Sequence, residues 1–201
     1  MFNLRHQNDT TMLIGRKEEL RELNDAFKSE YSEFVAVYGR RRVGKTFLVR
    51  EAFNYEFTFQ HTGVAKEKIA GQLAAFRTSL IDYGYKDCPE LASWPDAFNS
   101  LKVGIKSSRK KKKVIFIDEI SWMDTPKSNF VSALEHFWNS WCSARKDVLL
   151  IICASATSWI INKVIKDRGG LHNRVNTQIY LMPFTLKECE EYLQSRNIRI
   201  I

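Results

Sequence analysis

The chain has 201 residues, 44% of them hydrophobic, which is enough for one well-buried core and too short for two domains of ordinary size. Its 31 lysines and arginines outnumber 23 aspartates and glutamates, and the resulting net charge of +8 favours phosphate, nucleic-acid or acidic partners. No apolar run approaches the roughly 20 residues that cross a bilayer and no signal peptide opens the chain, so we expect one cytoplasmic domain, residues 1–201, with no membrane partner.

The first part of the chain is predicted to run helix, strand, loop, helix. Apolar side chains at helical spacing within 16–30, with charges between them, predict an amphipathic linker helix over about 13–30. A core of about 31–195 follows. It begins with a short apolar run at 34–38, which reads as a strand, and 47–53 suits a helix packed on a sheet.

The middle of the chain continues the alternation. Residues 55–61 are rich in strand-forming side chains, residues 65–82 have a helical pattern, and another helix is predicted to start around Pro95, because proline is favoured in a first turn. The runs 114–118 and 148–154 are continuously apolar and too short for typical helices. Such runs belong to strands that are covered on both faces.

The last predicted elements are a strand at 178–182 and a helix at about 186–195. Thr185 and Glu188 have the spacing of a capping box, which predicts where that helix begins. Strands that alternate with helices imply an α/β fold with a parallel sheet.

A glycine loop joins the first strand to its helix. Gly39, Gly44, Lys45 and Thr46 match G-x-x-x-x-G-K-[ST], in which backbone amides surround a phosphate, the lysine bridges two phosphates and the hydroxyl holds Mg²⁺. The alternative is an ordinary glycine turn, which has no need of Lys-Thr at the helix start. The predicted cofactor-binding segment is Gly39, Arg40, Arg41, Arg42, Val43, Gly44, Lys45, Thr46 and Phe47.

The arginines of this loop, Arg40 to Arg42, occupy positions whose side chains fan away from the phosphate. We interpret them as solvated or salt-bridged side chains that add positive potential, with contact to a neighbouring molecule as the alternative.

Two carboxylates follow the apolar run 114–118. Asp118 and Glu119 stand at the carboxyl edge of a buried strand, where open α/β sheets bind ligands. We predict that Asp118 serves the Mg²⁺ shell and that Glu119 is the general base for the attacking water. A strand that merely ends in an acidic turn is the alternative.

The motifs together resemble the AAA-related and STAND-like P-loop ATPases often called the archaeal-type ATPase family. The similarity runs over nearly the whole chain. It rests, in order, on LIGRKEEL, FVAVYGRRRVGKTFLVREAF, VIFIDEISWMD, SALEHFWNSW, LLIICASATSW, GGLHNRV and YLMPFTLKECEEYL.

The resemblance implies a P-loop three-layer sandwich whose parallel sheet has the order 5-1-4-3-2. That order puts Ser155 near the γ-phosphate as a sensor, with Thr157 as second choice and helix capping as the alternative role. It also implies that Arg174 is an arginine finger, in its own or a neighbouring subunit, with Arg168 or a plain surface role as alternatives.

The same resemblance assigns Ile14, Gly15 and Arg16 to the entry segment that covers the adenine. Family members continue into a helical lid and a winged helix, which we expect to be absent here.

Other signals favour structural roles. The aromatic stripe between Phe130 and Trp141 indicates core packing, with a partner surface as the alternative. The basic run Arg109 to Lys113 indicates a solvated loop, with contact to nucleic-acid phosphates as the alternative. His61 is interpreted as a polar cap at a strand end, with approach to a substrate as the alternative. His136 and His172 lack the spaced neighbours of a metal site.

The sequence therefore predicts a Mg²⁺-dependent ATPase whose cycle drives a conformational change. The alternatives are a nucleotide-operated signalling or defence switch with little turnover, or a DNA-associated AAA ATPase. A homo-oligomer and a nucleic-acid or protein partner are compatible with both the charge and the resemblance.

Overall fold

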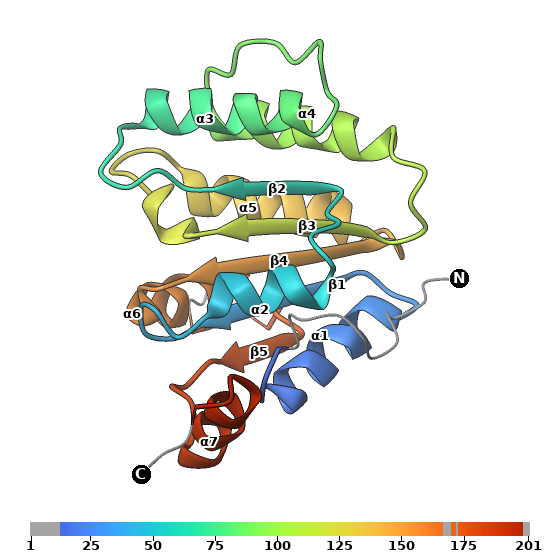
Figure 1. Ribbon diagram of the computed structural model, residues 1–201. Coiled ribbons are helices and arrows are strands. Elements are labelled where there is room, and N and C mark those ends of the chain that lie inside the picture. Colours follow the sequence, from blue (N-terminus) through green and yellow to red (C-terminus); the bar gives the residue numbers. More distant parts are fainter. Residues whose placement is uncertain (1–12, 167–169, 172, 199–201) are drawn as a thin grey trace.

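A computed structural model describes residues 13–166, 170–171 and 173–198. Within them lies one five-stranded sheet with helices on both faces (Figure 1). The strands are β1 (Glu33–Tyr38), β2 (Phe59–Thr62), β3 (Lys113–Asp118), β4 (Val148–Ala154) and β5 (Thr177–Tyr180). The α-helices are α1 (Lys17–Lys28), α2 (Lys45–Ala52), α3 (Ile69–Asp82), α4 (Trp94–Lys106), α5 (Phe130–Phe137), α6 (Thr157–Ile160) and α7 (Leu186–Ser195). Shorter helical segments are η1 (Ile120–Trp122), η2 (Trp138–Cys142) and η3 (Ile161–Ile165).

The sheet confirms the predicted α/β class and strand order. Its order is β2-β3-β4-β1-β5, which read from the other edge is 5-1-4-3-2, and every neighbouring pair is parallel. All strands therefore end at one edge of the sheet, and the loops that follow β1, β3 and β4 meet there.

Three layers arise from the alternation of side chains along the buried strands. Phe34 and Ala36 of β1 join the core formed with α3, α4 and α5, whereas Val35 and Val37 join the core formed with α1 and α2. Figure 1 shows α2 in front of the sheet and α5 behind it. Both faces of the central strands are thus covered, which explains why their sequences are continuously apolar.

The aromatic stripe packs in the core, as predicted. Phe130, Leu134 and Phe137 are fully buried and Trp138 is nearly so. α5 continues at Trp138 as the π-helical segment η2, and the indole of Trp141 lies on the Phe137 ring, with centroids 5.5 Å apart.

Two elements begin later than the sequence predicts. β2 starts at Phe59 rather than residue 55, because Asn54 and Tyr55 have positive φ angles of 49° and 60° that an extended strand does not accommodate. α3 starts at Ile69 rather than 65, after Lys66 with φ of 60°.

The last helix matches its prediction. The Thr185 hydroxyl accepts from the Glu188 amide at 3.2 Å, and the Glu188 carboxylate accepts from the Thr185 amide at 2.8 Å. This capping box sets the start of α7 at Leu186.

The basic run Arg109 to Lys113 is less solvated than expected. The Lys112 ammonium donates to the carbonyls of Ser29 and Tyr31, at 2.9 and 2.5 Å, and Lys113 forms an ion pair with Asp147 at 2.8 Å. These lysines connect loops at the amino-terminal edge of the sheet, opposite the edge where the strands end.

All four cysteines are free thiols. In the part of the chain that the structure describes, no helix is long and apolar enough to cross a membrane.

Candidate nucleotide-binding site

The glycine loop turns the chain from β1 into α2 and depends on glycine at two positions. Gly44, the residue before α2, has a φ of 93°, which side chains disfavour. Gly39 has a φ of 149°, and a Cβ there would lie 2.3 Å from the Leu181 carbonyl oxygen. The loop therefore packs closely on the chain after β5 and directs the free amides at the start of α2 to the end of the sheet.

The three arginines, Arg40 to Arg42, are exposed. Their exposure agrees with the prediction that these side chains fan away from the loop interior. A role as nucleotide contacts stays a prediction, as it does for Val43 and Phe47.

Lys45 reaches back over the loop. Its side chain is only 5% exposed, and Nζ donates to the Gly39 carbonyl at 3.1 Å, the Arg40 carbonyl at 2.8 Å and the Ser155 hydroxyl at 3.2 Å. Because an ammonium has three hydrogens, these contacts fix its position at the mouth of the loop.

Thr46 and Asp118 contact each other through their side-chain oxygens. The Thr46 hydroxyl donates to Asp118 Oδ2 at 2.7 Å, and the other carboxylate oxygen accepts from the Glu119 amide at 2.9 Å. Asp118 is 4% exposed. Hydroxyl and carboxylate oxygens are hard ligands of the kind that Mg²⁺ prefers, so the residues present fit this ion.

Glu119 is turned towards the end of β4. The Ser155 hydroxyl donates to Glu119 Oε1 at 2.7 Å, and the Ser155 amide lies 3.4 Å from Oε2. Glu119 has a φ of 45°, in the left-handed region where non-glycine residues are uncommon. Ser155 thus connects the Lys45 ammonium to the Glu119 carboxylate, whereas Thr157 lies in the first turn of α6.

The floor beneath these groups contains a neutral thiol. Burial, and the neighbouring Asp118 carboxylate, raise the pKa of Cys153 well above its usual range. The Cys153 thiol therefore adds no charge to the site.

Arg16 holds the entry segment against the loop. Its guanidinium, 5% exposed, donates to the Met182 carbonyl at 2.7 Å, approaches the Val43 carbonyl at 3.5 Å and lies 4.6 Å from the Phe184 ring centroid. The side chain is thus occupied with protein groups. Contact of Ile14, Gly15 and Arg16 with an adenine stays a prediction.

Arg174 lies far from this site in its own chain. It is exposed and precedes β5, and Asn176 accepts from the Phe34 amide at the start of β1, at 2.9 Å. Because β5 and β1 are parallel, Arg174 is at the amino-terminal edge, beyond Phe34, which itself lies about 17 Å along β1 from Gly39. A finger role for Arg174 stays a prediction, and from this position it would act towards another copy. Arg168 and His172 lie outside the described residues.

Sequence reasoning missed two connections between distant segments. Glu188 was identified only as a helix cap, but its carboxylate also accepts from the Arg16 amide at 3.2 Å. Gln72, fully buried on α3, accepts from the Val64 amide at 3.0 Å and donates to the Trp122 carbonyl at 3.0 Å, which holds the turn after Glu119. An isolated glutamine in a helical pattern gives no local signal of such a contact.

Comparisons with known proteins agree with this arrangement. A family model described as an ATPase domain predominantly from Archaea matches residues 13–196. An uncharacterized protein of Methanocaldococcus jannaschii is 26% identical over 183 residues, covering 90% of this chain and 38% of the relative. An uncharacterized ATP-binding protein of the same organism is 42% identical over 40 residues, which are 20% of this chain and 68% of that protein.

Solved structures share the fold at low identity. The Walker-type ATPase of Pyrococcus abyssi has a TM-score of 0.62 at 15% identity, covering 94% of this chain and 60% of that one. The ORC2 protein of Aeropyrum pernix, in ADPNP–ADP complexes, has a TM-score of 0.66 at 15% identity. The match covers 96% of this chain and 54% of that one. The chain thus spans 38% of its longer curated relative and little more than half of these solved chains.

Proposed function

Because the chain belongs to the family of ATPase domains found predominantly in Archaea, we propose that it binds ATP with Mg²⁺ and hydrolyses it to ADP and phosphate. The observation that carries the proposal is the contact between Thr46 and Asp118, 2.7 Å, beside the Lys45 ammonium. The Thr46 hydroxyl, the Asp118 carboxylate and the Lys45 ammonium therefore lie together near the start of α2. The backbone amides of a helix start favour the binding of phosphate there.

Each residue has a role in this reaction. The Lys45 ammonium neutralises charge on the β- and γ-phosphates, and Thr46 and Asp118 would hold the Mg²⁺ ion. Glu119 accepts the proton of the water that attacks the γ-phosphorus, as the bond to the β-phosphate oxygen breaks. Bound Mg²⁺ supplies charge stabilisation on the phosphate oxygens.

We propose further that Ser155 reports the γ-phosphate to the rest of the chain. Its hydroxyl contacts both Lys45 and Glu119, so any movement of either group on nucleotide binding alters its hydrogen bonds. This connection offers a route by which the cycle drives a conformational change.

Steady-state phosphate release tests the proposal. Glu119→Gln should lower kcat by about 10²- to 10⁴-fold, the usual contribution of a general base, while ATP still binds. Glu56→Gln, an exposed acid away from the site, is the matched control. Equal turnover by Glu119→Gln and an active wild type would show that Glu119 is not the base.

Isothermal titration separates binding from turnover. Lys45→Ala should weaken ATP binding by about 10- to 100-fold, because it removes a charge-assisted contact worth about 1.5–3 kcal/mol. The exposed Lys111→Ala is the control. Unchanged affinity in Lys45→Ala would place the nucleotide elsewhere.

One observation favours a second function, a nucleotide-operated switch with little turnover. Both carboxylate oxygens of Glu119 face Ser155, at 2.7 and 3.4 Å, which directs the base towards β4 rather than towards a water. This reading predicts tight nucleotide binding, negligible phosphate release and an oligomer that changes with ATP.

A further inference from the structure

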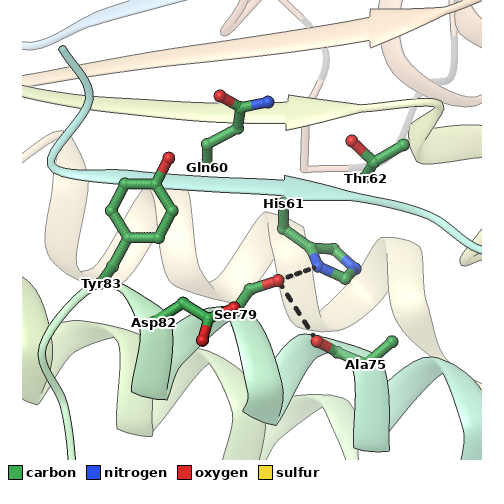
Figure 2. A pocket seen from close by; sticks show the side chains of 7 residues that line it. All are labelled: Gln60, His61, Thr62, Ala75, Ser79, Asp82 and Tyr83. Carbon is green, nitrogen blue, oxygen red and sulfur yellow. Dashed lines mark hydrogen bonds between the residues drawn. The ribbon is translucent and has the colours of Figure 1, made fainter. Parts of the chain in front are cut away.

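A groove follows the outer edge of β2, far from the glycine loop in the strand order. It has a volume of about 350 Å³ and is lined by Gln60, His61 and Thr62 of β2 and by Ala75, Ser79, Asp82 and Tyr83 of α3 and its end (Figure 2). Successive side chains of a strand point to opposite faces of the sheet. A cavity lined by three consecutive strand residues therefore runs along the edge of the strand and not over one face.

That edge presents unpaired backbone groups. Within the described residues, β2 is the end strand and pairs only with β3. The Gly63 amide donates to the Asp118 carbonyl of β3 at 3.0 Å, and alternation along the strand then turns the amides and carbonyls of Gln60 and Thr62 outward. Two donors and two acceptors are thus available to a further strand.

The wall opposite the strand edge combines small and acidic side chains. Ala75 and Ser79 are one helical turn apart on α3 and leave room beside β2, and Asp82 follows at the end of the helix with its carboxylate exposed. Figure 2 shows Asp82 and Tyr83 at the same end of the groove. The exposed Asp82 carboxylate gives this end of the groove a local negative charge, which favours a basic side chain in a partner.

His61 adds a buried acceptor to the lining. The Ser79 hydroxyl donates to the Ala75 carbonyl at 3.2 Å, so its oxygen accepts from Nδ1 of His61 at 2.9 Å. The side chain is 3% exposed, and Nε2 has no hydrogen-bond partner.

We propose that the groove binds an extended peptide segment of a partner protein, which adds to the edge of β2 as a sixth strand and places a lysine or arginine against Asp82. Strand addition uses main-chain hydrogen bonds for affinity and alternate side chains for specificity. β2 has four residues, about 13 Å, so three or four residues of the partner would lie in the groove.

Selection from a random heptapeptide phage library, followed by fluorescence anisotropy with synthetic peptides, tests the proposal. We expect enriched peptides to contain lysine or arginine and to lose at least about tenfold in affinity for Asp82→Lys, which reverses the charge at the groove. Asp87→Lys, an exposed acid outside the groove lining, is the matched control and should bind as wild type.

Backbone N-methylation of the peptides distinguishes strand addition from side-chain binding. Methylation of the alternate amides that face β2 should abolish binding, while methylation of the other set should leave it within about twofold, since only one set faces the strand in a ladder. ATP affinity of each protein variant confirms that it is folded.

Three results would overturn the proposal. Selection on the wild-type protein could enrich no peptide, the enriched peptides could bind Asp82→Lys as well as they bind wild type, or methylation of either set of amides could have the same effect. Dimerisation through β2 in sedimentation velocity, lost in Asp82→Lys, would assign the edge to a second copy instead.

Discussion

The Thr46 hydroxyl donates a hydrogen bond of 2.7 Å to the carboxylate of Asp118, although the two residues are 72 positions apart in the chain. The contact exists because β1 and β3 end at the same edge of the sheet with only β4 between them. It brings the first residues of α2 to the end of β3, and with them the two groups that we assign to Mg²⁺.

Loss of the Asp118 carboxylate should remove the metal dependence of nucleotide binding. We expect Asp118→Asn to weaken ATP binding in Mg²⁺ by at least about tenfold, while binding in EDTA stays within about twofold of wild type, because only the ion contact is lost. Titration calorimetry in both buffers measures the difference. The exposed Asp87→Asn is the control. If Mg²⁺ raised the ATP affinity of Asp118→Asn as much as it raises that of wild type, the assignment would be contradicted.

Ser155→Ala distinguishes hydrolysis from switching. If Ser155 holds Glu119 and the phosphate in a productive arrangement, its loss should lower kcat by about 10²-fold, comparable to the loss of one stabilising donor. If the contact at 2.7 Å instead keeps Glu119 away from water, kcat should rise. Phosphate release decides between them, with the exposed Ser158→Ala as control.

The position of Arg174 leads to a prediction about copies of the chain. Because Arg174 lies at the sheet edge opposite its own glycine loop, any finger role has to be played in another copy. Arg174→Ala and Glu119→Gln should then each be inactive alone, with a loss for Arg174→Ala of about 10³- to 10⁵-fold in rate.

Mixing the two variants should restore turnover at the interfaces where an intact Glu119 meets an intact Arg174. A coupled phosphate assay of the mixture measures it. If the mixture turned over ATP no faster than the separate variants, or if Arg174→Ala were fully active, Arg174 would have no finger role.

The buried imidazole of His61 should make stability depend on pH. Burial lowers the pKa of His61 from 6.5 to about 4, so the unfolded chain takes up a proton below about pH 6.5 while the folded chain stays neutral until about pH 4. The contribution of His61 to the free energy of unfolding is therefore present above pH 6.5 and lost as the pH falls towards 4.

Urea unfolding of wild type and His61→Gln at about pH 7 and about pH 5 measures this contribution. Between these two pH values the free energy of unfolding should fall by about 2 kcal/mol more for wild type than for His61→Gln. The exposed His136→Gln should behave as wild type. Parallel pH profiles for wild type and His61→Gln would show that His61 titrates normally.

Much of the fold was predictable because it depends on local patterns. Continuous apolar runs predicted β3 and β4 nearly to the residue, and the capping box predicted the first residue of α7. The loop was equally clear, since its glycines, lysine and threonine follow one another within eight residues. The sheet order itself came from a resemblance to a family and not from these patterns.

Other features depended on contacts between distant segments. Arg16 reads in sequence as part of a nucleotide-covering segment, but its guanidinium donates to the carbonyl of Met182, 166 positions away. Positive φ angles at Asn54 and Tyr55 shortened β2 despite its strand-forming side chains.

By itself the sequence determined which residues could bind phosphate and metal, because a glycine loop and a carboxylate after an apolar strand carry their chemistry in their own residue types. Only the tertiary structure decided that Ser155 joins Lys45 to Glu119, that Arg174 lies at the sheet edge opposite its own site and that β2 is the end strand among the described residues. The physical reason is that neighbours in a parallel sheet are chosen by packing between segments far apart in the chain, which no local pattern encodes.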